Sequence, residues 1–403
     1  MEEWRTYKLG EICTKIGSGA TPNGGKEAYL GGDTSLIRSQ NVLDFSFSWD
    51  GLAYINEYQA SKLDGVEIER NDVLLNITGD SVARACIVPD DALPARVNQH
   101  VAIIRGNHSM VLNEYILYFL QFKKQNLLSL SQGGATRNAL TKGMIENLDI
   151  LLPELSEQKK IVSILKSFDD KIECNRRIND NLEQQAQALF KSWFVDFEPF
   201  KEGEFVESEM GMIPKGWTVG ALSEIANITM GTSPSGSSYN VTGEGDVFYQ
   251  GRAEFGFRFP TRNMYTTEAK RFAEIDSVLL SVRAPVGDIN VAEERCCIGR
   301  GLASVQSKDG NNSFMLYLMQ NLQPVFDRFN GEGTVFGCIN KKALEDMTIL
   351  IPDKETMAKF DNVCSKMDGQ IKTLDQESRR LAQLRDTLLP RLMSGELKVE
   401  AGF

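Results

Sequence analysis

Two stretches of the chain carry seam residues at alternating steps of four and three, which is the heptad pattern of a coiled-coil helix. The second stretch repeats the steps of the first 199 residues further along the chain. The first series is Ile161, Leu165, Phe168, Ile172, Asn175, Asn179, Leu182, Ala186, Leu189 and Trp193. The second series is Phe360, Cys364, Met367, Ile371, Leu374, Ser378, Leu381, Arg385, Leu388 and Leu392. The pattern therefore predicts two long helices with matching seams.

The segment before each predicted helix has a similar order of short apolar runs. The first segment has β-like runs at 35–37, 73–77, 85–88 and 100–104, a buried helix at 115–122 and a final run at 145–152 before Pro153. The second segment has corresponding runs at 277–280, 314–318 and 347–351 before Pro352. This order predicts a tandem duplication of a globular domain followed by a helix, with similar scaffolds and dissimilar loops. Trp4, Trp217, Tyr118 and Tyr317 lie at apolar positions of these segments, and we expect them in the cores.

The predicted fold class is α+β, with two α/β domains separated by two long antiparallel coiled-coil helices in a pseudo-two-fold arrangement. The predicted parts are a first α/β domain at 1–153, a first helix at 154–200, a linker at 201–213, a second α/β domain at 214–352, a second helix at 353–397 and a tail at 398–403. The acidic stretch 201–212 is expected to be a surface connector without a core of its own.

Antiparallel pairing of the two helices within one chain is favoured because both seams share one register. Pairing by that symmetry sets Asn175 near Ser378 and Asn179 near Leu374. Polar residues in a seam cost stability but specify its register. Two alternatives remain open, in which each helix packs only on its own domain or pairs with a second copy of the chain.

Composition narrows the choice of function. No apolar run reaches the ~18 residues of a membrane helix and no signal peptide opens the chain, so we expect a cytoplasmic protein. The seven cysteines include no CxxC pair and the two histidines lack ligand spacing, which argues against structural zinc and favours reduced core cysteines. The net charge of -11 requires that any DNA-binding charge be concentrated on one face or supplied by partner subunits.

Motifs of catalysis and cofactor binding are not recognisable. The stretch 19–27 (GATPNGGKE) places Ala20 and Glu27 where a phosphate-binding loop needs a glycine and a hydroxyl residue. The sequence contains no Asn-Pro-Pro-aromatic motif and no convincing metal-nuclease cluster. We therefore expect a non-catalytic chain with no catalytic, cofactor-binding or metal-binding residues of its own.

The two halves end in distinctive ways. The first helix ends in LFKSWFVDF at 189–197 and the second in LLPRLMSGEL at 388–397, each after an Ile/Leu-rich run and a proline. With the tandem order, these endings resemble the specificity subunit of type I restriction-modification systems over essentially the whole chain.

The resemblance implies two target recognition domains that each dock in one half of a bipartite double-stranded DNA site, with the paired helices fixing the spacer. It also implies two methyltransferase subunits packed along the helices, which bring S-adenosylmethionine and the adenine-methylating site. Restriction and translocase subunits would add ATP and Mg chemistry. The specificity subunit itself would bind none of these cofactors.

Candidate DNA-contacting residues are polar side chains on loops, since Arg, Asn and Gln read base edges while Arg, Lys and hydroxyl groups contact phosphates. The candidates of the first domain are Arg38, Ser39, Gln40, Asn41, Thr78, Arg84, Arg96, Asn98, Gln99, Thr136, Arg137 and Asn138. Those of the second are Gln250, Arg252, Ser281, Arg283, Arg300, Thr334, Asn340 and Lys341. Each could instead be only a solvated turn residue. The rival function is a scaffold with two protein-binding modules on a coiled-coil strut, and a stand-alone enzyme is a weaker rival.

Overall fold

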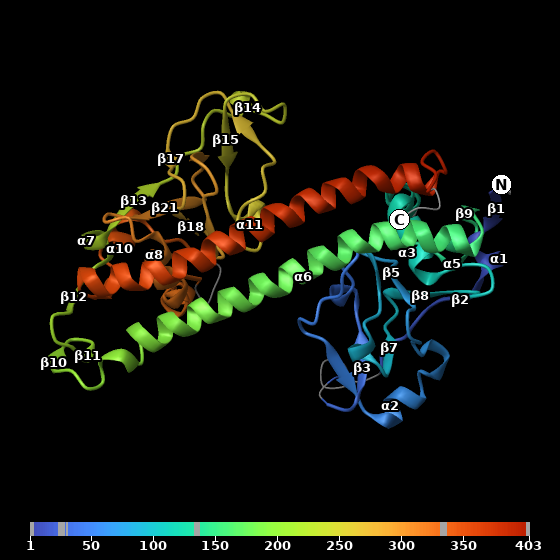
Figure 1. The fold of residues 1–403 in the computed structure, drawn as a ribbon, viewed down its shortest axis with the longest axis horizontal. Helices are drawn as coiled ribbons and strands as arrows, with labels where there is room; N and C mark the ends of the chain where they lie inside the picture. Colours follow the sequence, from blue (N-terminus) through green and yellow to red (C-terminus); the bar gives the residue numbers. More distant parts are fainter. Residues whose placement is uncertain (1–3, 23–28, 30, 133–137, 331–336, 400–403) are drawn as a thin grey trace. The chain divides into compact units, whose positions relative to one another are not determined.

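The computed structural model describes residues 4–22, 29, 31–132, 138–330 and 337–399 (Figure 1). Two compact units make up the chain, unit 1 from residues 1–175 and 376–403 and unit 2 from residues 176–375. The long helices are α6 (Leu155–Phe194) and α11 (Lys354–Met393), each of 40 residues, drawn in green and in orange to red in Figure 1. The unit boundaries cut both helices, so each unit holds one globular domain and half of each helix.

Unit 1 is built on a four-stranded sheet of order β2-β8-β5-β6 and a three-stranded sheet of order β4-β3-β7. Its strands are β1 (Arg5–Lys8), β2 (Cys13–Ser18), β3 (Thr34–Ile37), β4 (Ala53–Ile55), β5 (Val73–Asn76), β6 (Ala85–Ile87), β7 (Ala95–Val97), β8 (Val101–Gly106) and β9 (Asp149–Leu152). Its short helices are α1 (Leu9–Ile12), α2 (Glu57–Ser61), α3 (Asn113–Phe122), α4 (Lys124–Ser131) and α5 (Lys142–Glu146). Successive residues of β5 face opposite sides, as strand geometry requires. Val73 and Leu75 pack with α3 and the long helices, whereas Leu74 packs with the second sheet.

Unit 2 repeats this plan with a four-stranded sheet of order β13-β21-β18-β19 and a five-stranded sheet of order β14-β16-β15-β20-β17. Its strands are β10 (Phe205–Ser208), β11 (Gly211–Pro214), β12 (Thr218–Ala221), β13 (Ala226–Met230), β14 (Tyr239–Asn240), β15 (Asp246–Tyr249), β16 (Tyr265–Thr266), β17 (Phe272–Ala273), β18 (Val278–Ser281), β19 (Ile289–Val291), β20 (Cys296–Ile298), β21 (Leu302–Ser307) and β22 (Thr348–Ile351). Its short helices are α7 (Leu222–Ile225), α8 (Asn312–Asn321), α9 (Gln323–Asp327) and α10 (Lys341–Glu345). The parallel pair β15 and β20 matches the parallel pair β3 and β7 of unit 1. The predicted duplication and the α+β fold class are confirmed.

Antiparallel helix pairing is confirmed within each unit. In unit 1, the Asn175 side chain donates to Ser378 Oγ at 3.2 Å and to Glu377 Oε2 at 2.8 Å. In unit 2, the Asn179 side chain donates to the Ile371 carbonyl at 3.4 Å, three residues before Leu374 in α11. Both asparagines are buried, so two seam positions are fixed by polar contacts rather than by apolar packing.

The half of each long helix within a unit also packs on the globular domain of that unit, but the alternative in which the helices pack only on their own domains is wrong because they also pair. Phe190 and Phe194 of α6 lie beside the predicted seam and are buried against Phe314 of α8 and Phe360 of α11. Trp217 is also buried in this core, and its indole donates to Asp353 at 3.1 Å. Tyr118 and Tyr317 are buried as expected, while Trp4 is half-buried.

The acidic stretch between the domains lies on the surface and has no core of its own, as expected. It forms the hairpin of β10 and β11, and the Ile213 side chain of β11 belongs to the core of unit 2. Phe197 and Phe200 contact Trp217, with ring centroids 5.7 and 5.0 Å apart. The stretch 201–212 thus agrees with the expected surface connector, since all of its residues are exposed or half-buried, although its composition did not predict the two strands. No helix within the described ranges is long and apolar enough to cross a membrane.

Candidate nucleic-acid interface

Loops that follow four strands of the first domain meet at one end of its two sheets. The Gly19 amide donates to the Asn98 carbonyl at 3.1 Å, and the Asn98 amide donates to the Ile37 carbonyl at 3.1 Å. The Ile77 amide donates to the His100 carbonyl at 3.0 Å. A Cβ atom on Gly19 would lie 1.7 Å from the Val97 carbonyl oxygen, so this close approach requires glycine. The loops after β2, β3, β5 and β7 therefore form one continuous surface.

Side chains connect these loops further. The Thr21 hydroxyl donates to the Gln99 side chain, which also contacts the His100 ring at 3.2 Å. The other ring nitrogen of His100 lies 2.6 Å from the Thr78 hydroxyl. The Gly79 amide donates to the Asn138 carbonyl at 3.2 Å. Three predicted candidates, Thr78, Gln99 and Asn138, are thus brought together from distant parts of the sequence.

The second domain builds the same surface from the corresponding strands. The Gly301 amide donates to the Gln250 carbonyl at 3.2 Å, and the Val282 amide donates to the Gly301 carbonyl at 2.9 Å. The Arg300 amide donates to the Ser233 hydroxyl at 3.3 Å. Arg283 forms a β-bridge with Cys338, as Thr78 does with Ala139 in the first domain. The loops of Gln250, Arg283 and Arg300 therefore meet as those of Arg38, Thr78 and Gln99 do.

Burial separates the predicted residues into groups. The exposed candidates are Gln40, Gln99, Asn138, Gln250, Arg252, Arg283, Arg300, Asn340 and Lys341, and the half-buried ones are Arg38, Ser39, Thr78 and Arg84. Thr136, Arg137 and Thr334 lie outside the described residues. The remaining candidates, Asn41, Arg96, Asn98 and Ser281, are buried.

For Asn41 and Asn98 the expectation of an exposed side chain was wrong. Asn41 is fully buried, accepts from the Arg38 amide at 3.1 Å and donates to the carbonyls of Ser48 and Asp50. Asn98 accepts from the His100 amide at 3.0 Å. Both amides hold the backbone of their loops, because a short polar side chain can satisfy nearby main-chain groups.

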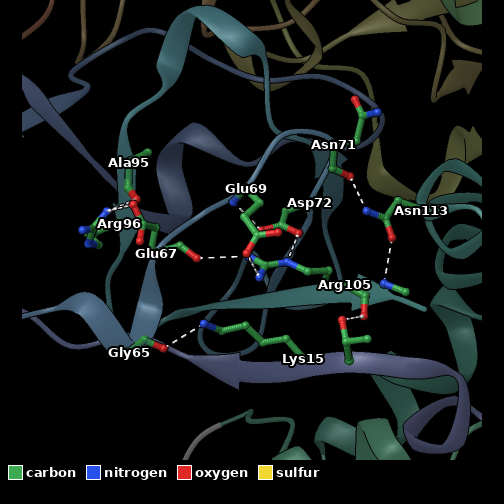
Figure 2. Close-up of polar contacts among 12 residues, drawn as sticks. Lys15, Gly65, Glu67, Glu69, Asn71, Asp72, Ala95, Arg96, Arg105 and Asn113 are labelled. Carbon is green, nitrogen blue, oxygen red and sulfur yellow. Dashed lines mark hydrogen bonds and ion pairs between the residues drawn. The ribbon is translucent and has the colours of Figure 1, made fainter. Parts of the chain in front are cut away.

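Arg96 and Ser281 are corrected for the same reason. Figure 2 shows Arg96 beside Glu67 and Ala95, and its guanidinium lies 3.3 Å from both Glu67 and Asp64 carboxylates. The Ser281 hydroxyl donates to the carbonyls of Arg283 and Pro285 in the turn after β18. Ser281 therefore holds a turn of the surface, whereas Arg96 is engaged by carboxylates outside these loops.

Several exposed or half-buried candidates already have partners within the domain. Arg38 and Gln40 donate to the Gly51 carbonyl, and Arg252 pairs with Asp288. Asn340 caps α10 by accepting from the Ala343 amide at 2.9 Å, and Lys341 lies 3.2 Å from Glu345. Such surface pairs are weak and can rearrange when a ligand arrives.

Two pairs of candidates occupy equivalent positions in the two domains. Gln99 and Arg300 are each the second residue after the parallel strand, β7 or β20. Thr78 and Arg283 are each the second residue after β5 or β18. The first domain thus presents an amide and a hydroxyl where the second presents two guanidinium groups. The two surfaces differ in the hydrogen bonds they offer.

Thr21 and Ser233 also belong to this surface, and the sequence analysis missed them as candidates. Each contacts the loop that carries Gln99 or Arg300. Each lies in the same short motif, Gly-Ala-Thr-Pro at 19–22 and Gly-Thr-Ser-Pro at 231–234. The repeated motif was the available signal.

The strand beneath the second surface is apolar. Cys296 and Cys297 of β20 are fully buried, and burial raises the pKa of the Cys296 thiol to about 12. Cys296 is therefore a neutral core residue at physiological pH. The polar groups available to a ligand lie in the loops.

Comparison with known proteins gives one consistent family. Residues 1–184 and 214–378 match the family model described as the type I restriction modification DNA specificity domain. The putative type I restriction enzyme MjaX specificity subunit of Methanocaldococcus jannaschii is 28% identical over 407 residues, covering 99% of this chain and 95% of that protein. The type I restriction enzyme HindI specificity subunit of Haemophilus influenzae is 24% identical, covering 98% of this chain and 100% of that protein.

One solved structure shares the fold over nearly the whole chain. The crystal structure of the type I restriction-modification system S subunit from M. genitalium has a TM-score of 0.57 at 15% identity. The alignment covers 97% of this chain and 96% of that chain.

Proposed function

The chain belongs to the family of type I restriction-modification DNA specificity subunits, and we propose on that premise that each of its two domains reads one half of a bipartite DNA site. Residues 1–153 and 214–352 are the two recognition domains in this proposal. The observation that carries it is the pair of equivalent loop surfaces with unlike side chains, in which Gln99 corresponds to Arg300 and Thr78 corresponds to Arg283 in the repeat. Unlike hydrogen-bonding groups on one scaffold suit two different base sequences.

We further propose that methyltransferase subunits, two in number, dock along α6 and α11 and bring S-adenosylmethionine to an adenine of the site. Such docking would cover exposed apolar side chains of both helices, among them Ile178 of α6 and Val363 and Leu384 of α11. Restriction subunits would contribute ATP-dependent translocation with Mg. This chain contributes no catalytic, cofactor or metal residue in the proposal, and it acts in the cytoplasm.

The net charge of -11 fits this division of labour. A complex that grips DNA must neutralise phosphates, and most of that charge would come from the methyltransferase subunits. We call the loop surface of each domain described above its reading surface. The exposed arginines of the second domain, Arg283 and Arg300, add local positive charge at its reading surface.

Modified-base sequencing tests the proposal directly. In DNA from cells that carry this chain with its partner subunits, we expect one methylated motif with two specified halves and an unspecified spacer of fixed length. Affinity of the purified complex for that site should fall steeply with salt, because phosphate contacts release counterions. A complete complex that methylates no motif, and whose DNA affinity does not depend on salt, would favour the scaffold function.

Single substitutions should map each domain to its half-site. Arg300→Ala is expected to weaken discrimination at one base pair by ~1–3 kcal/mol, or about 5-fold to 150-fold, because a bidentate contact to a base is lost. Gln99→Ala should do the same at a base pair of the other half-site. Competition binding with every single-base variant of the mapped site measures both effects.

Arg295→Ala is the matched control. Arg295 is an exposed arginine at the other end of β20, where it contacts Glu274 and the Phe272 ring. We expect this variant to retain the wild-type base preferences. If Arg300→Ala kept the wild-type base preferences, the proposal that Arg300 contacts a base would be wrong.

A further inference from the structure

A buried tyrosine–aspartate hydrogen bond ties the recognition domain of each unit to a long helix. Tyr118 of α3 donates to Asp169 of α6 at 2.7 Å, and Tyr317 of α8 donates to Asp368 of α11 at 2.7 Å. Both tyrosines and both aspartates are related by the same 199-residue repeat. Burial raises the pKa of each tyrosine, so both are hydroxyl donors at neutral pH.

An arginine completes each cluster, but the two arginines come from different elements. In unit 1, Arg385 of α11 donates to Asp169 at 2.6 Å and stacks on the ring of Phe45 in the domain, 3.6 Å from its centroid. In unit 2, Arg258 of the domain donates to Asp368 at 2.8 Å and also pairs with Glu183 of α6. The two arginine side chains are nearly buried.

The repeat shows which residues stand in place of the two arginines in the opposite unit. The residue of α6 that corresponds to Arg385 is Ala186, which is fully buried. The residue of the first domain that corresponds to Arg258 is Phe45, because each lies four residues after the last residue of a short 3-10 helix, Ser39–Asn41 or Arg252–Glu254. Each unit therefore contains one arginine where the domain meets the two long helices, which we call the junction. A long helix carries this arginine in unit 1, and the domain carries it in unit 2.

This junction adjoins the reading surface. The segment that ends at Phe45 begins at Arg38, and the segment that ends at Arg258 begins at Gln250. The backbone of each segment is also bonded to the corresponding strand, from the Phe45 amide to Ala85 in unit 1 and from the Val291 amide to Arg258 in unit 2. Movement at the junction is thereby transmitted to a loop proposed to contact bases.

Packing alone does not explain why these charges are retained. A buried ion pair seldom stabilises a fold more than apolar residues of equal volume, but it restricts the geometry of the groups it joins. A cluster that joins the domain to both long helices is suited to fix the angle between them.

We propose that Arg258 and Arg385 are positioning residues that hold each recognition domain at a set angle to its helices, so that the complex accepts only one spacer length. This inference rests on the proposed reading of a bipartite site. The arginines touch no base in the proposal, and their effect is on the placement of the loops rather than on the bases these loops select.

The test compares spacer profiles of the complete complex on DNA carrying both mapped half-sites, with spacers from two base pairs shorter to two base pairs longer than the natural one. For Arg258→Phe and Arg385→Met we expect the preference for the natural spacer to fall about tenfold, the effect of losing one charged hydrogen-bond network, with half-site bases unchanged. Arg262→Met is the matched control, because the exposed Arg262 pairs only with Glu294 at 2.6 Å among the described residues.

A rescue variant separates positioning from loss of folding. Arg258→Phe combined with Ala186→Arg rebuilds in unit 2 the arrangement of unit 1, and it should restore the spacer preference. Tyr317→Phe, which removes one hydroxyl group, should change the spacer profile in the same direction as Arg258→Phe. If Arg258→Phe does not fold, Tyr317→Phe takes its place as the test. A wild-type complex without spacer preference would sink the proposed function. If Arg258→Phe folds and keeps the wild-type spacer preference, this inference alone is overturned. If Arg258→Phe does not fold, an unchanged preference in Tyr317→Phe overturns it. A variant that loses affinity equally at every spacer also overturns it.

Discussion

Exchange of residues 214–352 for the equivalent domain of a relative is expected to replace one half-site and leave the other intact. The reading loops of unit 2 all lie within this segment, while those of unit 1 lie before α6. Two or three mismatched base pairs cost ~2–9 kcal/mol, so methylation of the original site should disappear. Modified-base sequencing of cells that carry the chimera measures the outcome.

The structure sets a condition on this exchange. The second domain packs on the helices through Phe314 and Tyr317 and is tied to them by Arg258. A donor domain that lacks these residues should fold poorly in the chimera. A second chimera that exchanges the whole of unit 2, residues 176–375, is the control because it carries its own helix halves. If both half-sites changed in folded chimeras, the modular reading of the site would be wrong.

Lengthening both long helices by one heptad is expected to shift the spacer and preserve both half-sites. The insertions belong between Asn175 and Arg176 in α6 and between Asp375 and Gln376 in α11, where the two units divide. Seven helical residues add ~10 Å, which corresponds to at most about three base pairs of DNA. The altered complex should therefore methylate sites with a longer spacer and no longer methylate the original ones.

The paired insertion matters because each helix contributes to both units. A heptad added to α6 alone cannot keep both the Asn175–Ser378 contact of unit 1 and the Asn179–Ile371 contact of unit 2. We expect the single insertion to weaken binding at every spacer length. Methylation mapping that finds the original spacer in the doubly lengthened chain would contradict a ruler function of the helices.

The long helices and the duplication were predictable because their signals are periodic. A heptad seam needs only the spacing of apolar residues, and its repetition 199 residues later made the pairing register explicit. The Asn175–Ser378 contact follows from that register. The buried strands β5 and β18 were also recognisable, since both their faces are covered and each begins with three consecutive apolar residues.

The reading surface was only partly predictable because exposure depends on contacts between distant segments. Gln40 and Asn41 are adjacent residues that both carry a side-chain amide. Asn41 is buried and donates to the carbonyls of Ser48 and Asp50, whereas Gln40 is exposed. Turn residues satisfy backbone groups or face solvent according to the neighbouring loop, which local sequence does not specify. The same reason hid Arg258 and Arg385, whose aspartate partners lie 110 and 216 residues away.

One junction arginine lies on a long helix and the other lies on a domain. This difference affects whether the two domains of the chain could exchange positions by recombination. A first domain moved into the second position would bring Phe45 where Arg258 stands, and the half-buried carboxylates of Glu183 and Asp368 would lose their arginine partner. A second domain moved into the first position would place Arg258 beside Arg385, two cations at the half-buried Asp169, while the other partner of Arg385, Asp386, is exposed. Exchange of the two domains within this chain would therefore leave neither cluster with its present balance of charge. Each recognition domain of this chain is thus suited to its own position and not to the other.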